Sequence, residues 1–287
     1  MIAFIGSVFS PYYAAARRWG AADPLAHCAL NVALYGGARK RWAMTERGRH
    51  RLSRSADALA IGPSTLSWDE TGLTVRINEV TAPWPSRIQG VVRLHCPRIA
   101  EESIALDAAG QHRWRPIAPV ADAEIALTRP ALCWSGPAYL DSNFGAVPLE
   151  SDFSGWSWSR TTLRGGTVVL YDVIPRIGAR APLARYYARS GDVITLVPPP
   201  PVTLTPTRWR LSRATRAEAG AKIQATLEDT PFYARSLVAT RLLGQAATAM
   251  HETLALDRFR AAWVQAMLPF RMPRWSGAGG RPGLHAS

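Results

Sequence analysis

Short runs in which apolar and polar residues alternate constrain this fold more than any other feature of the chain. Leu73, Val75 and Ile77 alternate with polar neighbours, which is the period of a strand with one buried face. Residues 250–256 repeat this pattern and predict the second arm of a hairpin that turns near Gly244. Residues 167–173, TVVLYDV, predict a more fully buried strand. Strands are therefore expected in both halves of the chain.

Turn-forming residues separate these runs, since the 287 residues include 22 glycines and 22 prolines. Residues 193–197 predict a further strand, which ends where the prolines at 198–201 form a stiff linker. The two halves share a similar rhythm of strands and turns, which favours an all-β protein of two antiparallel barrel or sandwich domains. We place these domains at residues 1–148 and 149–274, followed by a disordered tail, residues 275–287, rich in Gly, Ser and Pro.

The chain is strongly basic, with a formal net charge of +13 that is carried almost wholly by arginine. Lys40 and Lys222 are its only lysines. The arginines are dispersed and accompany no recognised nucleic-acid motif, so we expect no nucleic-acid partner. Attraction to an anionic membrane surface and a plain compositional bias towards arginine remain as explanations.

The N-terminal residues 1–18 are apolar but carry no basic region ahead of the apolar part, and they contain Pro11. This pattern does not predict a signal peptide. No run reaches the roughly 20 apolar residues that cross a bilayer, so any membrane contact is expected to be peripheral. Cys28, Cys96 and Cys133 are widely spaced, which suits a reducing compartment better than a disulfide scaffold.

Six strings resemble the carotenoid 1,2-hydratase family, whose members are also called hydroxyneurosporene synthases. In chain order they are FIGSVFSPYY (4–13), NVALYG (31–36), RWAMTERG (41–48), YLDSNFG (139–145), LEDTPFYARSLV (227–238) and LPFRMPR (268–274). The resemblance implies a pair of lipocalin-like β-barrels, in agreement with the strand pattern. It also implies a hydro-lyase that adds water to the terminal C1–C2 double bond of acyclic carotenoids such as neurosporene and lycopene.

Members of this family usually carry a further N-terminal segment, rich in Trp and Tyr, ahead of the string that opens this chain. Without it, the first barrel is expected to lose a strand and to expose an edge. We therefore expect that upstream residues would improve activity.

Hydration of such an alkene requires a strong acid for C2, electron-rich faces near a tertiary cation at C1, and a placed water. It requires no metal and no redox cofactor. In the family the YLD string carries an essential acid, which the resemblance assigns to Asp141. Alternation puts Tyr139 on the same strand face as Asp141. Asp141 as a turn cap with Ser142 and Asn143 is the alternative.

His112 and Trp114 form a second pair on one strand face, and the resemblance puts both in the same pocket. Trp114 would offer its π face to the cation, and His112 would position the water or accept its proton. The alternative is a core tryptophan beside a surface histidine. Trp156 and Trp158 also share a face and are candidates to line a channel for the polyene, although core packing is the commoner use of such a pair.

Other charged or polar residues in the six strings were left out of the catalytic set, because such groups are more often structural partners of arginines such as Arg47 and Arg235. They are Asn31, Glu46, Glu228 and Asp229. The substrate dissolves in membrane, so the enzyme is expected at the cytoplasmic face of a bacterial inner or intracytoplasmic membrane. Two other functions stay open, a lipocalin-like carrier of an apolar ligand and an acid-catalysed cyclase or pericyclase of the same fold.

Overall fold

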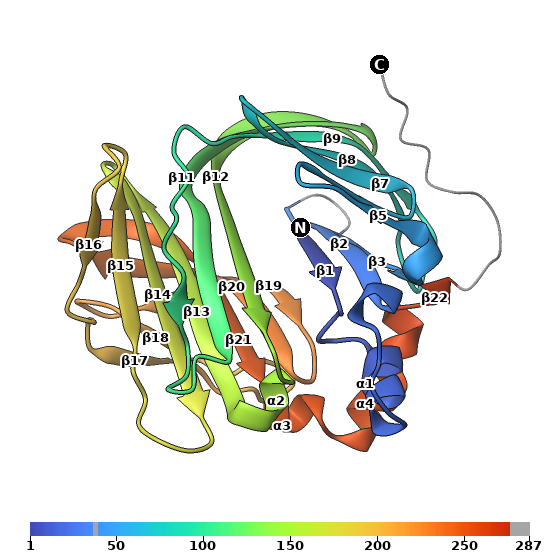
Figure 1. Ribbon diagram of the computed structural model, residues 1–287. Coiled ribbons are helices and arrows are strands. Elements are labelled where there is room, and N and C mark those ends of the chain that lie inside the picture. Colours follow the sequence, from blue (N-terminus) through green and yellow to red (C-terminus); the bar gives the residue numbers. More distant parts are fainter. Residues whose placement is uncertain (37–39, 276–287) are drawn as a thin grey trace. The chain divides into compact units, whose positions relative to one another are not determined.

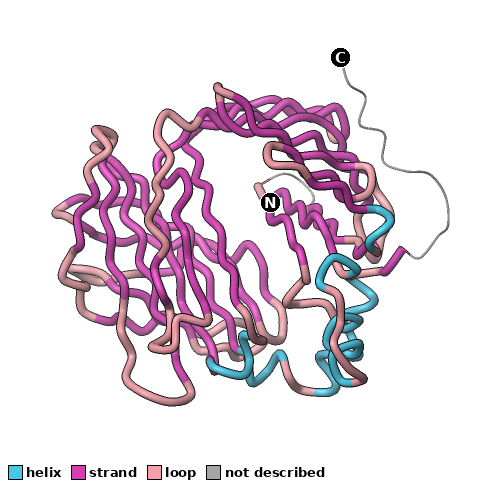
Figure 2. Tube along the Cα trace, in the orientation of Figure 1, coloured by secondary structure: helices cyan, strands magenta, loops and turns pink. Residues whose placement is uncertain are grey.

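The computed structural model describes residues 1–36 and 40–275 (Figure 1). Within this part the chain forms two compact units. Unit 1 contains residues 1–97, 122–138 and those from 265 onward, and unit 2 contains residues 98–121 and 139–264. Strands make up most of both units, whereas helices are few and short (Figure 2). None of the helices in the described part is long and apolar enough to cross a membrane.

Unit 1 is built on two sheets. Its elements are β1 (Ile2–Ile5), α1 (Pro11–Arg18), β2 (Cys28–Leu34), β3 (Arg41–Met44), β4 (Glu46–Arg47), β5 (Leu52–Arg54), β6 (Ala58–Ile61), β7 (Ser64–Asp69), β8 (Gly72–Val80), β9 (Arg87–His95) and β22 (Arg274–Trp275). The first sheet has the order β1-β2-β4-β22, with β3 also paired to β2. In the second, β9, β8, β7, β6 and β5 follow one another as antiparallel neighbours. The pair β4 and β22 is parallel.

Unit 2 is built on one seven-stranded antiparallel sheet with the order β16-β15-β14-β13-β21-β20-β19. Its elements are β10 (Ile104–Ala105), α2 (Leu149–Asp152), β13 (Phe153–Leu163), β14 (Gly166–Pro175), β15 (Leu183–Ala188), β16 (Val193–Thr195), β17 (Pro201–Leu204), β18 (Arg213–Arg216), β19 (Lys222–Asp229), β20 (Tyr233–Leu242), β21 (Gln245–Ala255) and α3 (Leu256–Phe259). The strands β17 and β18 form a separate antiparallel pair.

Three elements contribute residues to both units: β11 (His112–Arg129), β12 (Ala131–Gly145) and α4 (Ala262–Arg271). The compact units therefore do not follow the division at residue 148 that we expected from the sequence. Because β11 and β12 are single strands of 18 and 15 residues, no turn signal marks the two points within them where the chain passes from one unit to the other. The expected tail from residue 275 falls, beyond Trp275, outside the described residues.

The two faces of the seven-stranded sheet differ in character. On one face, Val168 and Leu170 pack with Leu163, Ala184 and Leu242 in an apolar core. The strand β18 packs against β13 and β21, on the side where His251 Nε2 lies 2.9 Å from the carbonyl oxygen of Ala214. The opposite face carries large aromatic and charged side chains, and it is the face on which the candidate site is built.

The antiparallel all-β, lipocalin-like fold predicted from the sequence is confirmed, and so are its main strands. Val75 and Ile77 are buried in β8 as the alternation requires, and residues 167–173 lie in β14, which is buried along most of its length. The run 193–197 is a strand only over β16, whose three residues are exposed. The predicted hairpin is β20 and β21, which turns through Leu243 and Gly244 at positive φ, as a two-residue hairpin turn requires.

Candidate active site

The centre of the candidate site is one carboxyl group held by two neutral donors. Trp114 on β11 is fully buried, and its Nε1–H donates to Asp141 Oδ2 over 2.9 Å. The hydroxyl of Tyr139 donates to the same oxygen over 3.0 Å. Tyr139 and Asp141 lie two residues apart on β12 and therefore point to the same side of the strand. The structure thus brings together three of the residues singled out in the sequence.

The surroundings of Asp141 favour its protonated form. Burial raises its pKa from 3.8 to about 6, and the negative charge of Glu252 adds to the rise. The hydrogen bonds from Trp114 and Tyr139 and the charge of Arg160 lower the pKa but do not cancel the effect of burial. Burial also raises the pKa of Tyr139 well above its usual range. Tyr139 therefore remains a donor, and Asp141 can hold a proton near neutral pH.

Aromatic rings surround this carboxyl group. The ring of Trp158 lies 5.4 Å from that of Tyr139, and the ring of Trp114 lies 5.8 Å from that of Tyr171, edge to face. Trp156 contacts Tyr171 in the same manner at 6.1 Å. Trp156 and Trp158, predicted to share a face, therefore both contact rings that adjoin Asp141. Such π faces attract a cation.

His112 lies apart from the carboxyl group of Asp141. Its Nε2 lies 2.9 Å from Asp152 Oδ2, at the end of α2, and its ring packs against Phe153 at a centroid distance of 4.8 Å. Its backbone N–H donates to Asp107 Oδ1 over 2.7 Å. His112 is fully buried, so the surface position that was the alternative for this histidine is wrong. The structure shows no hydrogen bond between His112 and the trio around Asp141.

Glu252 and Arg235 are further members of the site, and we did not predict them from the sequence. In the register of the sheet, Glu252 on β21 lies opposite Trp158 on β13 and opposite Arg235 on β20. Arg235 Nε donates to Glu252 Oε1 over 2.9 Å, and Arg235 Nη2 lies 2.7 Å from the same oxygen. One feature of the sequence could have identified Glu252. It is a carboxylate at a position of the alternating run whose neighbours on the same face, Met250 and Leu254, are apolar.

Glu46, Asp229 and Asn31, which we did not assign to the catalytic set, have structural partners, and Glu46 pairs with an arginine as expected. Glu46 is fully buried and pairs with His27 and Arg274, while Arg47 pairs with Glu79. Asp229 accepts a hydrogen bond from the backbone of Arg208, and Asn31 donates one to the carbonyl of Ala43. Within residues 1–36 and 40–275, no group of three or more His, Cys, Asp and Glu side chains is arranged to hold a metal ion.

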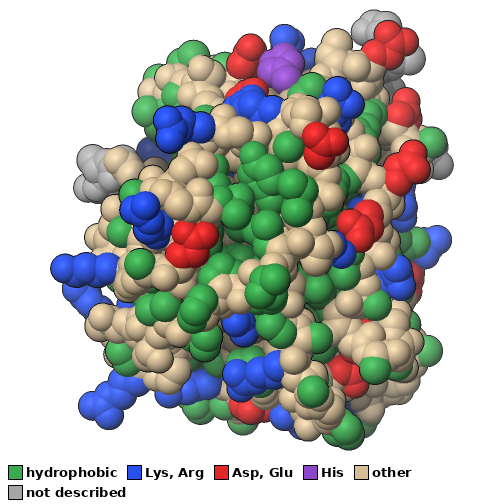
Figure 3. All heavy atoms as spheres, turned by 90° about the vertical axis from the view of Figure 1, so that its left-hand side faces the viewer, with side chains coloured by type: hydrophobic (Ala, Val, Ile, Leu, Met, Phe, Trp, Pro, Cys, Tyr) green, Lys and Arg blue, Asp and Glu red, His purple; other side chains and the backbone are tan. Residues whose placement is uncertain are grey.

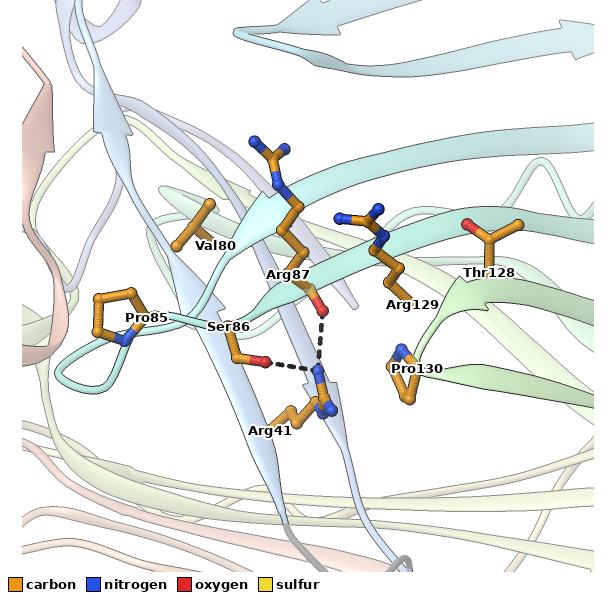
Figure 4. Close-up of a pocket in the computed structure, with 8 residues that line it drawn as sticks. All are labelled: Arg41, Val80, Pro85, Ser86, Arg87, Thr128, Arg129 and Pro130. Atoms are coloured by element: carbon orange, nitrogen blue, oxygen red, sulfur yellow. Dashed lines mark hydrogen bonds between the residues drawn. The ribbon is translucent and has the colours of Figure 1, made fainter.

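A separate basic depression of about 560 Å³ lies in unit 1. Three arginines line it, together with residues of the β8–β9 turn and of the end of β11 (Figure 4). Arg41 donates to Ser86 Oγ over 2.7 Å and to the carbonyl of Arg87 over 2.9 Å. None of the described residues that line the depression is acidic, so the positive charge of Arg41, Arg87 and Arg129 is not neutralised within it.

A protonatable carboxyl group enclosed by aromatic rings on a lipocalin-like β fold defines a protein suited to acid chemistry on an apolar ligand. The comparisons with known proteins specify the class further. The chain belongs to the carotenoid hydratase CrtC family, whose model matches residues 1–279.

Two acyclic carotenoid 1,2-hydratases illustrate the likeness. The one from Thiocapsa roseopersicina is 56% identical over 280 residues, which cover 96% of this chain and 69% of that protein. The one from Cereibacter sphaeroides is 40% identical over 281 residues, covering 96% and 99% of the two chains. A solved structure, a putative AttH from Nitrosomonas europaea, has the same fold with a TM-score of 0.55 at 14% identity, covering 80% of each chain.

Proposed function

We propose that this protein adds water across the terminal C1–C2 double bond of acyclic carotenoids such as neurosporene and lycopene, with Asp141 as the acid. The relatives that are 40 to 56% identical along nearly the whole chain are named for this reaction. The single structural observation that supports the proposal is the carboxyl group of Asp141, whose pKa is raised to about 6 and whose hydrogen-bond donors are both neutral.

The chemistry follows from these contacts. Asp141 transfers its proton to C2, the π electrons form the new C2–H bond, and C1 becomes a tertiary cation. The ring of Trp114, and those of Tyr139 and Trp158, offer electron-rich faces that stabilise this cation. Water then forms a bond to C1 and loses a proton. Tyr139 and Trp114 stabilise the carboxylate that remains, because both donate to its Oδ2.

Trp156, Trp158 and His112, the other predicted site residues, position the substrate or other groups in this proposal. Trp156 and Trp158 line the path of the polyene, since both lie on the sheet face that carries the rings around Asp141. His112 follows from the family resemblance, and its hydrogen-bonding distance to Asp152 would orient it at the end of β11. The reaction as written consumes only alkene and water, so the proposal includes no cofactor.

The test is expression in a lycopene-producing bacterium, followed by mass analysis of the pigments. A gain of one water per hydrated end is expected with the native chain and not with Asp141→Asn. A bound but unchanged carotenoid would indicate a carrier, and a product isomeric with lycopene would indicate a cyclase. Either result would contradict the hydratase proposal.

We also propose that the protein contacts the cytoplasmic face of a membrane peripherally, through unit 1. Trp84 in the β8–β9 turn is 84% exposed and directly precedes Pro85 and Ser86 of the basic depression. Leu132 and Trp134, just beyond Pro130, are exposed as well. Exposed tryptophans beside unneutralised arginines suit the interface of an anionic bilayer.

Unit 2 offers a matched control for this membrane proposal. Figure 3 shows apolar side chains gathered on a face of unit 2, with basic side chains at its margin. Val193 and Ile194 of β16 and Val197 beyond it are exposed. With vesicles containing anionic lipid, Trp84→Ser combined with Arg129→Ser should reduce sedimentation, and high salt should do the same. Loss of binding in Val197→Asp alone would move the contact to unit 2.

A further inference from the structure

The proposed reaction requires a group that accepts a proton from the attacking water, and Glu252 is placed to do so. It lies in the middle of β21, and its cross-strand neighbour on β13 is Trp158. Its negative charge acts on both Asp141 and Tyr171, since it raises the pKa of each. Glu252 therefore faces the same aromatic surroundings as the acid.

The ion pair between Glu252 and Arg235 is made through one carboxylate oxygen. Two nitrogens of Arg235 contact Oε1, at 2.9 and 2.7 Å. Glu252 is thus paired with a guanidinium, unlike Asp141, whose donors are neutral. The two contacts from Arg235 involve Oε1 and not Oε2. A carboxylate that is paired through one oxygen can take up a proton on the other.

Trp158, the cross-strand neighbour of Glu252, supplies a donor. Its Nε1–H is buried and has no acceptor among the described residues. Directly opposed residues on antiparallel strands have Cβ atoms about 4.5 to 5.5 Å apart, so the side chains of Trp158 and Glu252 start from adjacent positions on the same face of the sheet. A buried N–H of this kind normally has a hydrogen-bond partner, and a water molecule accepts from it while donating to a carboxylate.

We propose that Glu252 accepts the proton of the water that adds to C1, and that Trp158 Nε1–H orients this water. The inference rests on the proposed hydratase function. The C1–O bond forms as one O–H bond of the water breaks, and that proton goes to Glu252. Asp141 has by then lost its own proton to C2. Return of the proton from Glu252 to Asp141 restores both groups, so the net reaction consumes one alkene and one water.

His112 is the competing acceptor, since the family resemblance suggested it. Its Nε2 already lies 2.9 Å from Asp152 Oδ2, and the structure shows no hydrogen bond between His112 and the trio around Asp141. Glu252, by contrast, acts electrostatically on Asp141 itself. The geometry favours Glu252.

Deuterium exchange separates the two proton transfers. Reversible protonation of C2 in D₂O places deuterium on the recovered carotenoid even when no water is captured. Glu252→Gln should therefore lose hydration by about 10²-fold while deuterium incorporation continues, and Asp141→Asn should lose both. The comparison is made at about pH 5, where the acid step is favoured in each variant. Glu252→Asp, which keeps a carboxylate, should retain more hydration than Glu252→Gln.

The same sheet provides the control. Asp172 pairs with Arg216 through Arg216 Nε at 2.9 Å, with side-chain exposures of 23% and 18%, close to the 21% and 14% of Glu252 and Arg235. Asp172→Asn removes a similar ion pair on the opposite face and should leave the ratio of hydration to exchange unchanged.

Three results would overturn the inference while leaving the hydratase proposal intact. They are wild-type hydration by Glu252→Gln, joint loss of exchange and hydration in a folded Glu252→Gln variant, and separation of the two activities by His112→Gln instead. A native protein that neither hydrates nor exchanges would contradict the proposed function itself.

Discussion

Two carboxyl groups, the fully buried Glu79 in unit 1 and the partly buried Asp141 in unit 2, show that the partners of an acid determine its role. Glu79 in unit 1 is fully buried and is held by Arg47 over 2.7 Å and by the hydroxyl of Ser64 over 2.6 Å. Asp141 in unit 2 is held by an indole N–H and a phenol. Burial raises the pKa of both groups. Only Glu79 has a cation in direct contact.

The difference teaches that burial alone does not make a catalytic acid. The positive charge of Arg47 opposes the effect of burial on Glu79 and ties its carboxylate to one structural partner. Asp141 keeps an accessible proton because its partners are neutral and because it is only partly buried. Glu79 is therefore expected to matter for stability, and Asp141 for turnover.

Asp141→Asn should produce the largest change in activity. The amide keeps the shape and much of the hydrogen bonding but has no proton acidic enough to form the cation, so hydration should fall by about 10² to 10⁴-fold. Folding should be retained, as judged by circular dichroism and thermal unfolding. Hydration of lycopene at the native rate by a folded Asp141→Asn variant would contradict the assignment of the acid.

Glu79→Gln should show the opposite pattern. It leaves Arg47, which is 7% exposed, without a counter-charge, and breaking a buried pair in this way costs about 3 to 5 kcal/mol. Denaturant unfolding measures this loss. Hydration per folded molecule should stay close to native, and a selective loss of turnover without destabilisation would remove the contrast between the two units.

The pH dependence of stability should distinguish Asp141 from its amide. The pKa of Asp141 is raised from 3.8 to about 6, so its contribution is fully present below 3.8 and is lost as pH rises through about 6. The native protein should therefore lose up to about 3 kcal/mol relative to Asp141→Asn between about pH 4 and pH 7, and less to the extent that water reaches the carboxyl group. Urea unfolding of both proteins at the two pH values measures it, and parallel pH profiles would contradict it.

Trp114→Phe should have the smallest effect. It keeps an aromatic face but removes the N–H that lowers the pKa of Asp141, so hydration should fall by only about threefold to tenfold. The alkaline limb of the pH–rate profile should move to higher pH. Trp114→Ala should cost more, because it also opens a cavity. Equal activity of the two variants would remove the ring from the proposed mechanism.

The sequence predicted most of what depends on neighbouring residues. Alternation put Tyr139 and Asp141 on one strand face and identified β8 and the β20–β21 hairpin, and a continuous apolar run identified β14. It did not predict Glu252, because a carboxylate in a strand has no catalytic meaning until its cross-strand neighbours Trp158 and Arg235 are known. It also missed that His112 lies beside Asp152 rather than with Asp141.

The sequence by itself determined the class of fold and the family, since local period and motif strings are properties of short segments. Only the tertiary structure decided which polar side chains contact one another. Trp114 and Asp141 are 27 residues apart, Arg235 and Glu252 are 17 apart, and strand pairing sets each of these contacts. Tertiary structure also decided the division into units, because β11 and β12 each contribute residues to both without a break in the chain. A pKa depends on burial and on charges brought close by folding, so no local pattern could have given the value for Asp141.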